Sequence, residues 1–166
     1  GAVRAGGPAA TIPPDSTARL EAIYRERIEA SQTRFTEADV RFMTRMIAHH
    51  AQALEMAGLA PNRSEDPDIE ILAARLHAAQ VDEIATMRRW LAERGQAVPG
   101  PGASHAHPEP MPGMVSPERM RELEAARGLS FDLLFLTQMI EHHQGAVQMV
   151  RELFATDGAA QDEAAF

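Results

Sequence analysis

Hydrophobic side chains recur along most of the chain at intervals of three and four residues, the spacing that places them on one face of an α-helix. Glycines, prolines and short polar stretches separate these periodic segments. The pattern therefore predicts an all-helical fold. The expected helices span residues 16–31, 36–60, 67–94, 117–127 and 130–156.

Several of the predicted helices carry recognisable start and stop residues. Thr36 and Asp39 have the spacing of a capping box, and Pro61 marks the end of the helix that they open. Asp66 is a favourable N-cap for the next helix, and Pro67 is a favourable first residue. The remaining boundaries are expected at Asp15 or Ser16, Gly95, Ser116 and Ser130.

The segment at residues 39–56 is repeated, with a displacement of 93 positions, at residues 132–149. Two unrelated amphipathic helices would not share so many residue types. The repeat indicates an internal duplication, which should place two equivalent helices about a pseudo-twofold axis. The identical pairs are Asp39 and Asp132, Phe42 and Phe135, Thr44 and Thr137, Met46 and Met139, Ile47 and Ile140, His49 and His142, His50 and His143, Ala53 and Ala146, and Met56 and Met149.

The duplication also suggests how the chain is organised. We expect a flexible linker at residues 1–14 and one helical bundle domain at residues 15–166. The first repeat covers about 36–94 and the second about 116–166. The loop between them, residues 95–115, is rich in Gly, Pro and Ser.

Charge and cysteine content exclude several function classes. The chain has 24 acidic and 16 basic residues and a formal net charge of -8, which argues against binding of a nucleic-acid backbone. No apolar run approaches the roughly 20 residues that span a bilayer, so no membrane span is expected. Because the chain has no cysteine, it forms neither disulfides nor thiolate metal sites. Any soft metal has to be held by methionine and histidine.

Methionine and histidine occur together at helical spacing in both repeats. Met46 lies three residues before His49 and four before His50, so one helix surface brings its thioether near both imidazoles. Adjacent His side chains diverge by about 100°, so one faces the bundle interior and the other faces a rim or a neighbouring helix. The candidate ligands are Met46, His49, His50, Met139, His142 and His143, with Met43, Met56, Met149, His105, His107, Met111 and Met114 as auxiliaries.

Imidazole and thioether ligands together suit copper, as Cu(I) or Cu(II), and imidazoles alone also suit zinc. A ferritin-type di-iron site is disfavoured, because that site needs a Glu three residues before each histidine ligand, and neither His pair has one. These features favour a binding protein over an enzyme. A metal-dependent oxidase or hydrolase that uses Glu141 as a proton carrier is one alternative. Another is a metal-free helical interaction module, in which the Met stripe is core, Asp39 and Asp132 are caps and His77 is a surface residue.

Three motifs resemble those of the domain of unknown function 305 family: Met46-Ile-Ala-His-His-Ala-Gln-Ala, Met139-Ile-Glu-His-His-Gln-Gly-Ala and Met111-Pro-Gly-Met-Val-Ser-Pro. The stretch Gln80-Val-Asp-Glu-Ile-Ala-Thr-Met-Arg-Arg-Trp-Leu is similar to the second-helix pattern of that family. The resemblance covers most of the chain from about residue 36. It implies a ferritin-like four-helix bundle, a secreted or cell-envelope location in bacteria and, for some members, copper binding linked to copper tolerance.

The chain departs from that family at its C-terminal end. The partner helix of the second repeat would fall near residues 160–187, beyond Phe166. We therefore expect the last of the duplicated helical hairpins to be truncated, with its final helix beginning close to Gln161. Without that helix, the helix at 16–31 or a second subunit, as in a homo-oligomer, would have to cover an exposed apolar face.

Overall fold

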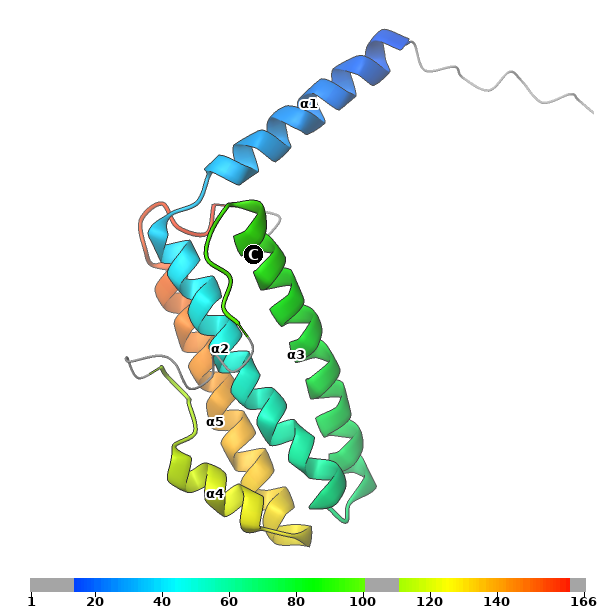
Figure 1. The fold of residues 1–166 in the computed structure, drawn as a ribbon, viewed down its shortest axis with the longest axis vertical. Coiled ribbons are helices and arrows are strands. Elements are labelled where there is room, and N and C mark those ends of the chain that lie inside the picture. The colour runs from blue at the N-terminus through cyan, green and yellow to red at the C-terminus, as the bar shows by residue number, and fades with distance from the viewer. Residues whose placement is uncertain (1–13, 101–110, 162–166) are drawn as a thin grey trace, which may run out of the picture.

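The computed structural model describes residues 14–100 and 111–161, and these residues form helices and connecting turns without any strand. Their all-helical character confirms the fold class predicted from hydrophobic spacing (Figure 1). The helices are α1 (Pro14–Thr33), α2 (Glu37–Leu59), the short 3₁₀ helix η1 (Ala60–Asn62), α3 (Pro67–Glu93), α4 (Pro117–Ala125) and α5 (Gly128–Phe154).

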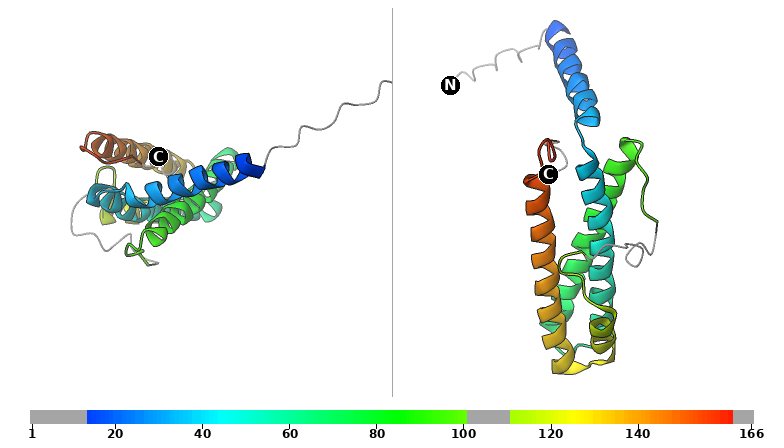
Figure 2. Two further views of the ribbon diagram at one scale, coloured as in Figure 1. Left: turned by 90° about the horizontal axis from the view of Figure 1, so that it is seen from above. Right: turned by 90° about the vertical axis from the view of Figure 1, so that its left-hand side faces the viewer.

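The helix α2 is the central element, because it packs against both α3 and α5. The helices α2 and α3 form an antiparallel hairpin closed by η1, and α5 runs antiparallel to α2 along its other side (Figures 1 and 2). The short helix α4 lies beside the first half of α5 (Figure 1). The two duplicated segments are therefore neighbours in space.

Most helix starts follow the local sequence. Thr36 and Asp39 form the predicted capping box of α2, and the Asp66 side chain accepts a hydrogen bond from the Asp68 amide at the start of α3. The predicted N-cap at Ser130 is wrong, because α5 already begins at Gly128. The Gly128 amide donates a 2.7 Å hydrogen bond to the carbonyl of Arg63, so this start depends on a contact with the α2–α3 connection.

Two buried clusters make up the core. The first lies between α2, α3 and the C-terminal half of α5. It is rich in sulfur, since five of its members are methionines. The second lies towards α4 and contains the stacked rings of Phe131 and Phe135, whose centroids are 5.7 Å apart. The methionines of the first cluster are Met43, Met46, Met87, Met111 and Met149.

The helix α1 projects away from the other helices (Figure 1). Its side chains Leu20, Ile23 and Tyr24 recur at helical spacing and are exposed. Among the residues that the structure describes, α5 has no antiparallel partner equivalent to α3, so only one of the two expected hairpins is observed. The C-terminal helix expected from about Gln161 falls almost entirely outside the described residues.

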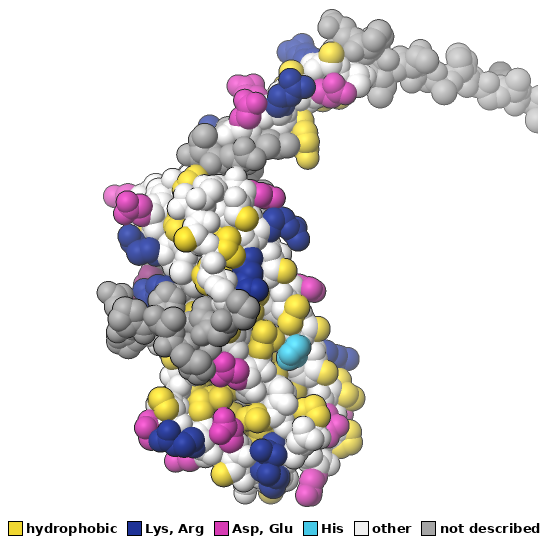
Figure 3. All heavy atoms as spheres, in the orientation of Figure 1, with side chains coloured by type: hydrophobic (Ala, Val, Ile, Leu, Met, Phe, Trp, Pro, Cys, Tyr) yellow, Lys and Arg dark blue, Asp and Glu magenta, His cyan; other side chains and the backbone are white. Residues whose placement is uncertain are grey.

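On the face drawn in Figure 3, side chains of both charges are scattered among hydrophobic ones, with no continuous basic area. None of the described helices combines the length and the apolar character that crossing a bilayer requires.

Candidate metal centre

The rings of His49 and His142 meet at the interface of α2 and α5. Their centroids are 3.7 Å apart, their planes are inclined by 36°, and the two residues are 0% and 1% exposed. These are equivalent positions of the duplication, so the antiparallel packing of the two repeats brings each ring against its counterpart. The expectation that one histidine of each pair faces the interior is confirmed.

The second histidine of each pair points away from this contact, and His50 is nevertheless buried. The ring centroid of His50 lies 6.4 Å from that of His49, and its Nε2 is 2.6 Å from the Glu83 carboxylate of α3. The ring of His143 lies 6.2 Å from that of His142, and its Nδ1 donates to the Met139 carbonyl at 2.8 Å. The four imidazoles therefore form an inner pair and two outer rings with different partners.

Burial keeps the inner imidazoles neutral. Removal from water is the main cause that lowers the pKa of His49 to about 4, although its hydrogen bond to Pro112 acts in the opposite direction. Burial is the main cause that lowers the pKa of His142 to about 3, and repulsion from a protonated His49 is the next largest cause. The pKa of His50 is also lowered, chiefly by burial, against the opposing effect of Glu83. Neutral rings keep the nitrogen lone pairs that metal ligation requires.

Three buried ring nitrogens have no hydrogen-bond partner in the part of the chain that the structure describes: Nδ1 of His49, Nδ1 of His50 and Nε2 of His142. Because Nε2 of His49 donates to the Pro112 carbonyl at 3.1 Å, the Nδ1 of the same neutral ring carries a free lone pair. A buried polar atom without a partner is costly, and such atoms often mark a site for an additional ligand.

The segment at residues 111–115 closes over the inner pair. The Gln52 side chain holds it from α2, since its amide group donates to the Val115 carbonyl at 2.9 Å and accepts from the Val115 amide at 2.8 Å. On the other side, Gly113 lies directly against the backbone of Gly145 in α5. Held by these two contacts, the segment presents the Pro112 carbonyl to His49.

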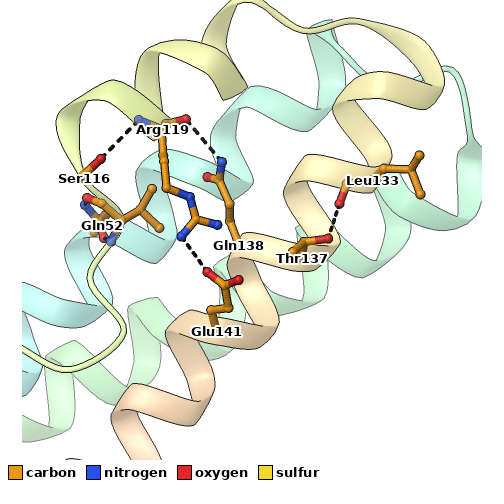
Figure 4. Close-up of polar contacts among 8 residues, drawn as sticks. Gln52, Ser116, Arg119, Leu133, Thr137, Gln138 and Glu141 are labelled. Atoms are coloured by element: carbon orange, nitrogen blue, oxygen red, sulfur yellow. Dashed lines mark hydrogen bonds and ion pairs between the residues drawn. The ribbon is translucent and has the colours of Figure 1, made fainter.

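The outer face of α5 is tied to α4 through Arg119 (Figure 4). The Arg119 guanidinium contacts the Glu141 carboxylate at 2.6 Å, and the Arg119 carbonyl accepts a 3.2 Å hydrogen bond from the Gln138 amide group. This arrangement occupies Glu141 in a half-exposed ion pair. It therefore gives no support to the alternative in which Glu141 carries protons for a metal centre.

The candidate thioethers divide between the two core clusters. Met43, Met46, Met111 and Met149 belong to the sulfur-rich cluster, against which Met114 packs, whereas Met56 and Met139 belong to the other. Met87 of α3 is a further member of the sulfur-rich cluster and was not among the ligands predicted from the sequence. Its spacing is the signal that could have identified it. Met87 follows Glu83, the partner of His50, by four residues and so lies on the same face of α3. His105 and His107 lie outside the described residues.

Within residues 14–100 and 111–161, no three His, Cys, Asp or Glu side chains converge as a metal-binding group. The inner pair supplies two imidazoles, and the surrounding core supplies thioethers rather than carboxylates. A donor set of this kind fits a soft metal ion better than a hard one.

The family model for "Domain of unknown function (DUF305)" matches residues 39–165, a range that includes both histidine pairs. The chain belongs to this family. Similar solved DUF305 structures come from two bacteria. A fragment from Deinococcus radiodurans is 32% identical, with a TM-score of 0.65, and the match covers 79% of this chain and 84% of that one.

A DUF305 protein from Streptomyces coelicolor, described as secreted, is 28% identical, with a TM-score of 0.63 and coverage of 77% of this chain and 79% of that one. Curated proteins gave no match. The family and the helical fold of this DUF305 chain are thus shared with solved relatives.

Proposed function

We propose that this DUF305 protein binds copper and sequesters it, with His49 and His142 as the central ligands. The observation that carries the proposal is the buried pair of neutral rings. Nδ1 of His49 and Nε2 of His142 have no hydrogen-bond partner among the described residues. Two adjacent imidazoles from different helices bring two nitrogen ligands to one place. Copper in both oxidation states accepts imidazole nitrogen.

Thioethers near the pair support copper over zinc. Met46 and Met139 precede the inner histidines by three residues, about one helical turn, and Met46 belongs to the sulfur-rich cluster. Soft thioether sulfur favours Cu(I), whereas zinc uses imidazole, carboxylate and thiolate. The outer rings of His50 and His143, and the loop residues Met111 and Met114, are the auxiliary ligands of this proposal.

We further propose that α2, α3 and α5 are three members of a ferritin-like four-helix bundle in an exported protein. Their antiparallel arrangement supports the bundle, since each repeat contributes a long helix to the α2–α5 interface. The secreted relative from Streptomyces coelicolor and the absence of a membrane-spanning helix from the described residues are compatible with export.

A competition titration with Cu(I), Cu(II) and Zn(II) against chelators of known affinity tests the proposal. We expect the variant His49→Ala/His142→Ala to bind copper at least tenfold more weakly than the native protein. The exposed His77 on α3 provides the control, and His77→Ala should leave the affinities for Cu(I) and Cu(II) unchanged. Equal copper affinities for the native protein and the double variant would falsify the assignment of these ligands.

A second variant tests the sulfur ligands without removing a buried ring. Met46→Leu/Met139→Leu keeps side-chain volume. It should weaken Cu(I) binding more than Zn(II) binding. Oxygen uptake during aerobic loading with Cu(I) or Fe(II) distinguishes the oxidase alternative, because sequestration predicts no turnover. A melting temperature that stays constant with every metal would instead favour the metal-free module.

A further inference from the structure

The ring of His50 lies at the α2–α3 interface, and its two nitrogens have different surroundings. Nε2 is 2.6 Å from the Glu83 carboxylate of α3. Because an ionised carboxylate only accepts hydrogen bonds, Nε2 carries the ring proton and Nδ1 of the neutral ring has a free lone pair. This Nδ1 is buried, and no residue of the described chain bonds to it. Histidine ligands of metals are usually held in this way, with one nitrogen bonded to a carboxylate and the other available.

The same contact sets the register between α2 and α3. The two helices are antiparallel (Figure 1), so a step of four residues back from His50 corresponds to a step of four residues forward from Glu83. These steps lead to Met46 and Met87. Both methionines belong to the sulfur-rich cluster, and they are 4% and 8% exposed. One thioether from each helix therefore lies about one turn from the contact of His50 with Glu83.

This group of donors is separate from the inner pair. His49 faces α5, whereas the neighbouring His50 faces α3, as the divergence of about 100° between adjacent side chains requires. Their ring centroids are 6.4 Å apart. Since imidazole nitrogen binds a metal at about 2.0–2.1 Å, two rings that share one ion at a tetrahedral angle lie closer together than that. His49 and His50 are thus placed to serve different ions.

The second repeat holds its outer ring differently. Nδ1 of His143 donates to the Met139 carbonyl of its own helix at 2.8 Å. A backbone carbonyl carries no net charge, so this ring lacks the carboxylate partner that His50 has. The arrangement of His50 therefore occurs once in the part of the chain that the structure describes.

We propose that Nδ1 of His50 and the thioethers of Met46 and Met87 form a second metal site, which takes one soft monovalent cation of the Cu(I) type. Thioether sulfur selects such an ion. Glu83 is the positioning residue of this site, because it contacts the ring and not the ion. It fixes the tautomer of His50, makes Nδ1 a better donor and offsets the charge of the cation. The inference adds a second ion to the proposed function, and it holds whether or not the inner pair binds one.

Nuclear magnetic resonance of labelled methionine methyl groups and histidine rings tests the site in the whole protein, with Ag(I) as the probe. Met46 lies one turn from both His49 and His50, so Met87 is the methionine that reports on the second site alone. We expect Ag(I) to shift the Met87 methyl group and the His50 ring with one common affinity. The rings of His49 and His142 report on the inner pair in the same spectra, so a failure there is seen separately. Zn(II) should leave the Met87 methyl group unshifted, because zinc does not use thioether ligands.

Two variants test the individual roles. Glu83→Gln keeps the size and a hydrogen-bond acceptor but removes the charge, and it should weaken Ag(I) binding, measured at Met87, at least tenfold. The neighbouring exposed carboxylate provides the control, and Asp82→Asn should leave this affinity unchanged. Met87→Leu keeps side-chain volume and should weaken the response of the His50 ring. Met120→Leu, on α4, should not.

The metal-free protein supplies a further readout, because its ring nitrogens should show the His50 proton on Nε2. A proton on Nδ1 would overturn the proposal, as would a Met87 methyl group that Ag(I) does not shift. Equal Ag(I) affinities of the native protein and Glu83→Gln would remove the role of Glu83. Shifts of Met87 and the inner rings that all reach completion with a single equivalent of Ag(I) would show one shared ion and contradict a second site.

Discussion

Gly113 and Gly145 meet backbone to backbone at the inner histidine pair. A Cβ atom on Gly145 would lie 2.5 Å from the Gly113 Cα and 2.1 Å from the Pro112 carbonyl oxygen. Real Cβ atoms do not approach other atoms so closely, so only glycine fits at position 145 without a shift of the segment. The close approach is what allows the Pro112 carbonyl to reach His49.

Replacement of Gly145 by alanine should therefore destabilise the protein, by about 1–3 kcal/mol, because the clash is with backbone atoms. Gly58 is the matched control, since it is exposed near the end of α2 and a Cβ there meets no atom within 4 Å. Gly58→Ala should be neutral or stabilising by up to about 1 kcal/mol, because alanine has the higher helix propensity. Urea unfolding measures both; a loss of stability in both variants would contradict the explanation.

Gln52 is expected to be the main anchor of the 111–115 segment on α2. The variant Gln52→Ala leaves the buried amide and carbonyl of Val115 without their partner, at a cost of about 2–4 kcal/mol. Hydrogen exchange of the Val115 amide should accelerate. Gln148 provides the comparison, since its exposed side chain bonds only to Glu152, and Gln148→Ala should change stability by less than about 0.5 kcal/mol.

Acidification should destabilise the metal-free protein through the inner histidines. Their pKa values are about 4 and 3 in the folded chain, below the ordinary value of 6.5, so the unfolded state binds more protons between those limits. Stability is therefore fully present above about pH 6.5 and falls as the pH approaches 4, by about 2.5 kcal/mol for each ring by pH 4.5.

The variant His49→Leu/His142→Leu should flatten this dependence, and His77→Ala should retain it. Unfolding free energies measured in urea from pH 4.5 to 7.5 provide the test. If the double variant keeps the native slope, the inner rings are not the groups that titrate.

The duplicated aspartates should respond differently to substitution. Asp39 accepts hydrogen bonds from Thr36 within the capping box and a 2.7 Å bond from the Ala160 amide, which ties the residues after α5 to the start of α2. Asp39→Asn should destabilise the protein by about 1–3 kcal/mol and expose the Ala160 amide to hydrogen exchange. Thr36→Ala should cost about 1 kcal/mol and leave that amide protected.

Asp132 instead accepts a 2.6 Å bond from the Ser64 hydroxyl, between α2 and α3. Ser64→Ala should therefore cost about 1.5–3 kcal/mol without affecting the Ala160 amide. A change in exchange at Ala160 in this variant would contradict the separate roles of the two aspartates.

Local sequence predicted the helices whose ends carry their own caps. The starts of α2, α3 and α4 depend on Thr36, Asp66 and Ser116, whose side chains bond to amides two or three residues away. The start of α5 was missed because its first amide bonds to Arg63, which is 65 residues earlier in the chain. The sequence pattern at Asp132 likewise indicated a cap, but its partner Ser64 comes from another element.

The duplication alone predicted one part of the candidate site, the inner histidine pair. Equivalence of His49 and His142, together with the 100° divergence of adjacent side chains, was enough to expect an inner pair. The Pro112 carbonyl and the Glu83 carboxylate could not be expected from helical spacing, because both come from segments outside the matched stretches 39–56 and 132–149. Which thioethers share a cluster also depended on how the helices pack.

The amide of Gln52 and the bare backbone of Gly145 occupy equivalent positions in the two repeats. The first repeat holds the segment at residues 111–115 by hydrogen bonds, and the second repeat leaves space for the backbone of this segment. The segment can therefore pass over the histidines in one direction only. The molecule is symmetric in its pattern of helical residues but directional in its assembly. A second copy of the first repeat would carry glutamine at the position of Gly145, where a Cβ atom would lie 2.1 Å from the Pro112 carbonyl oxygen.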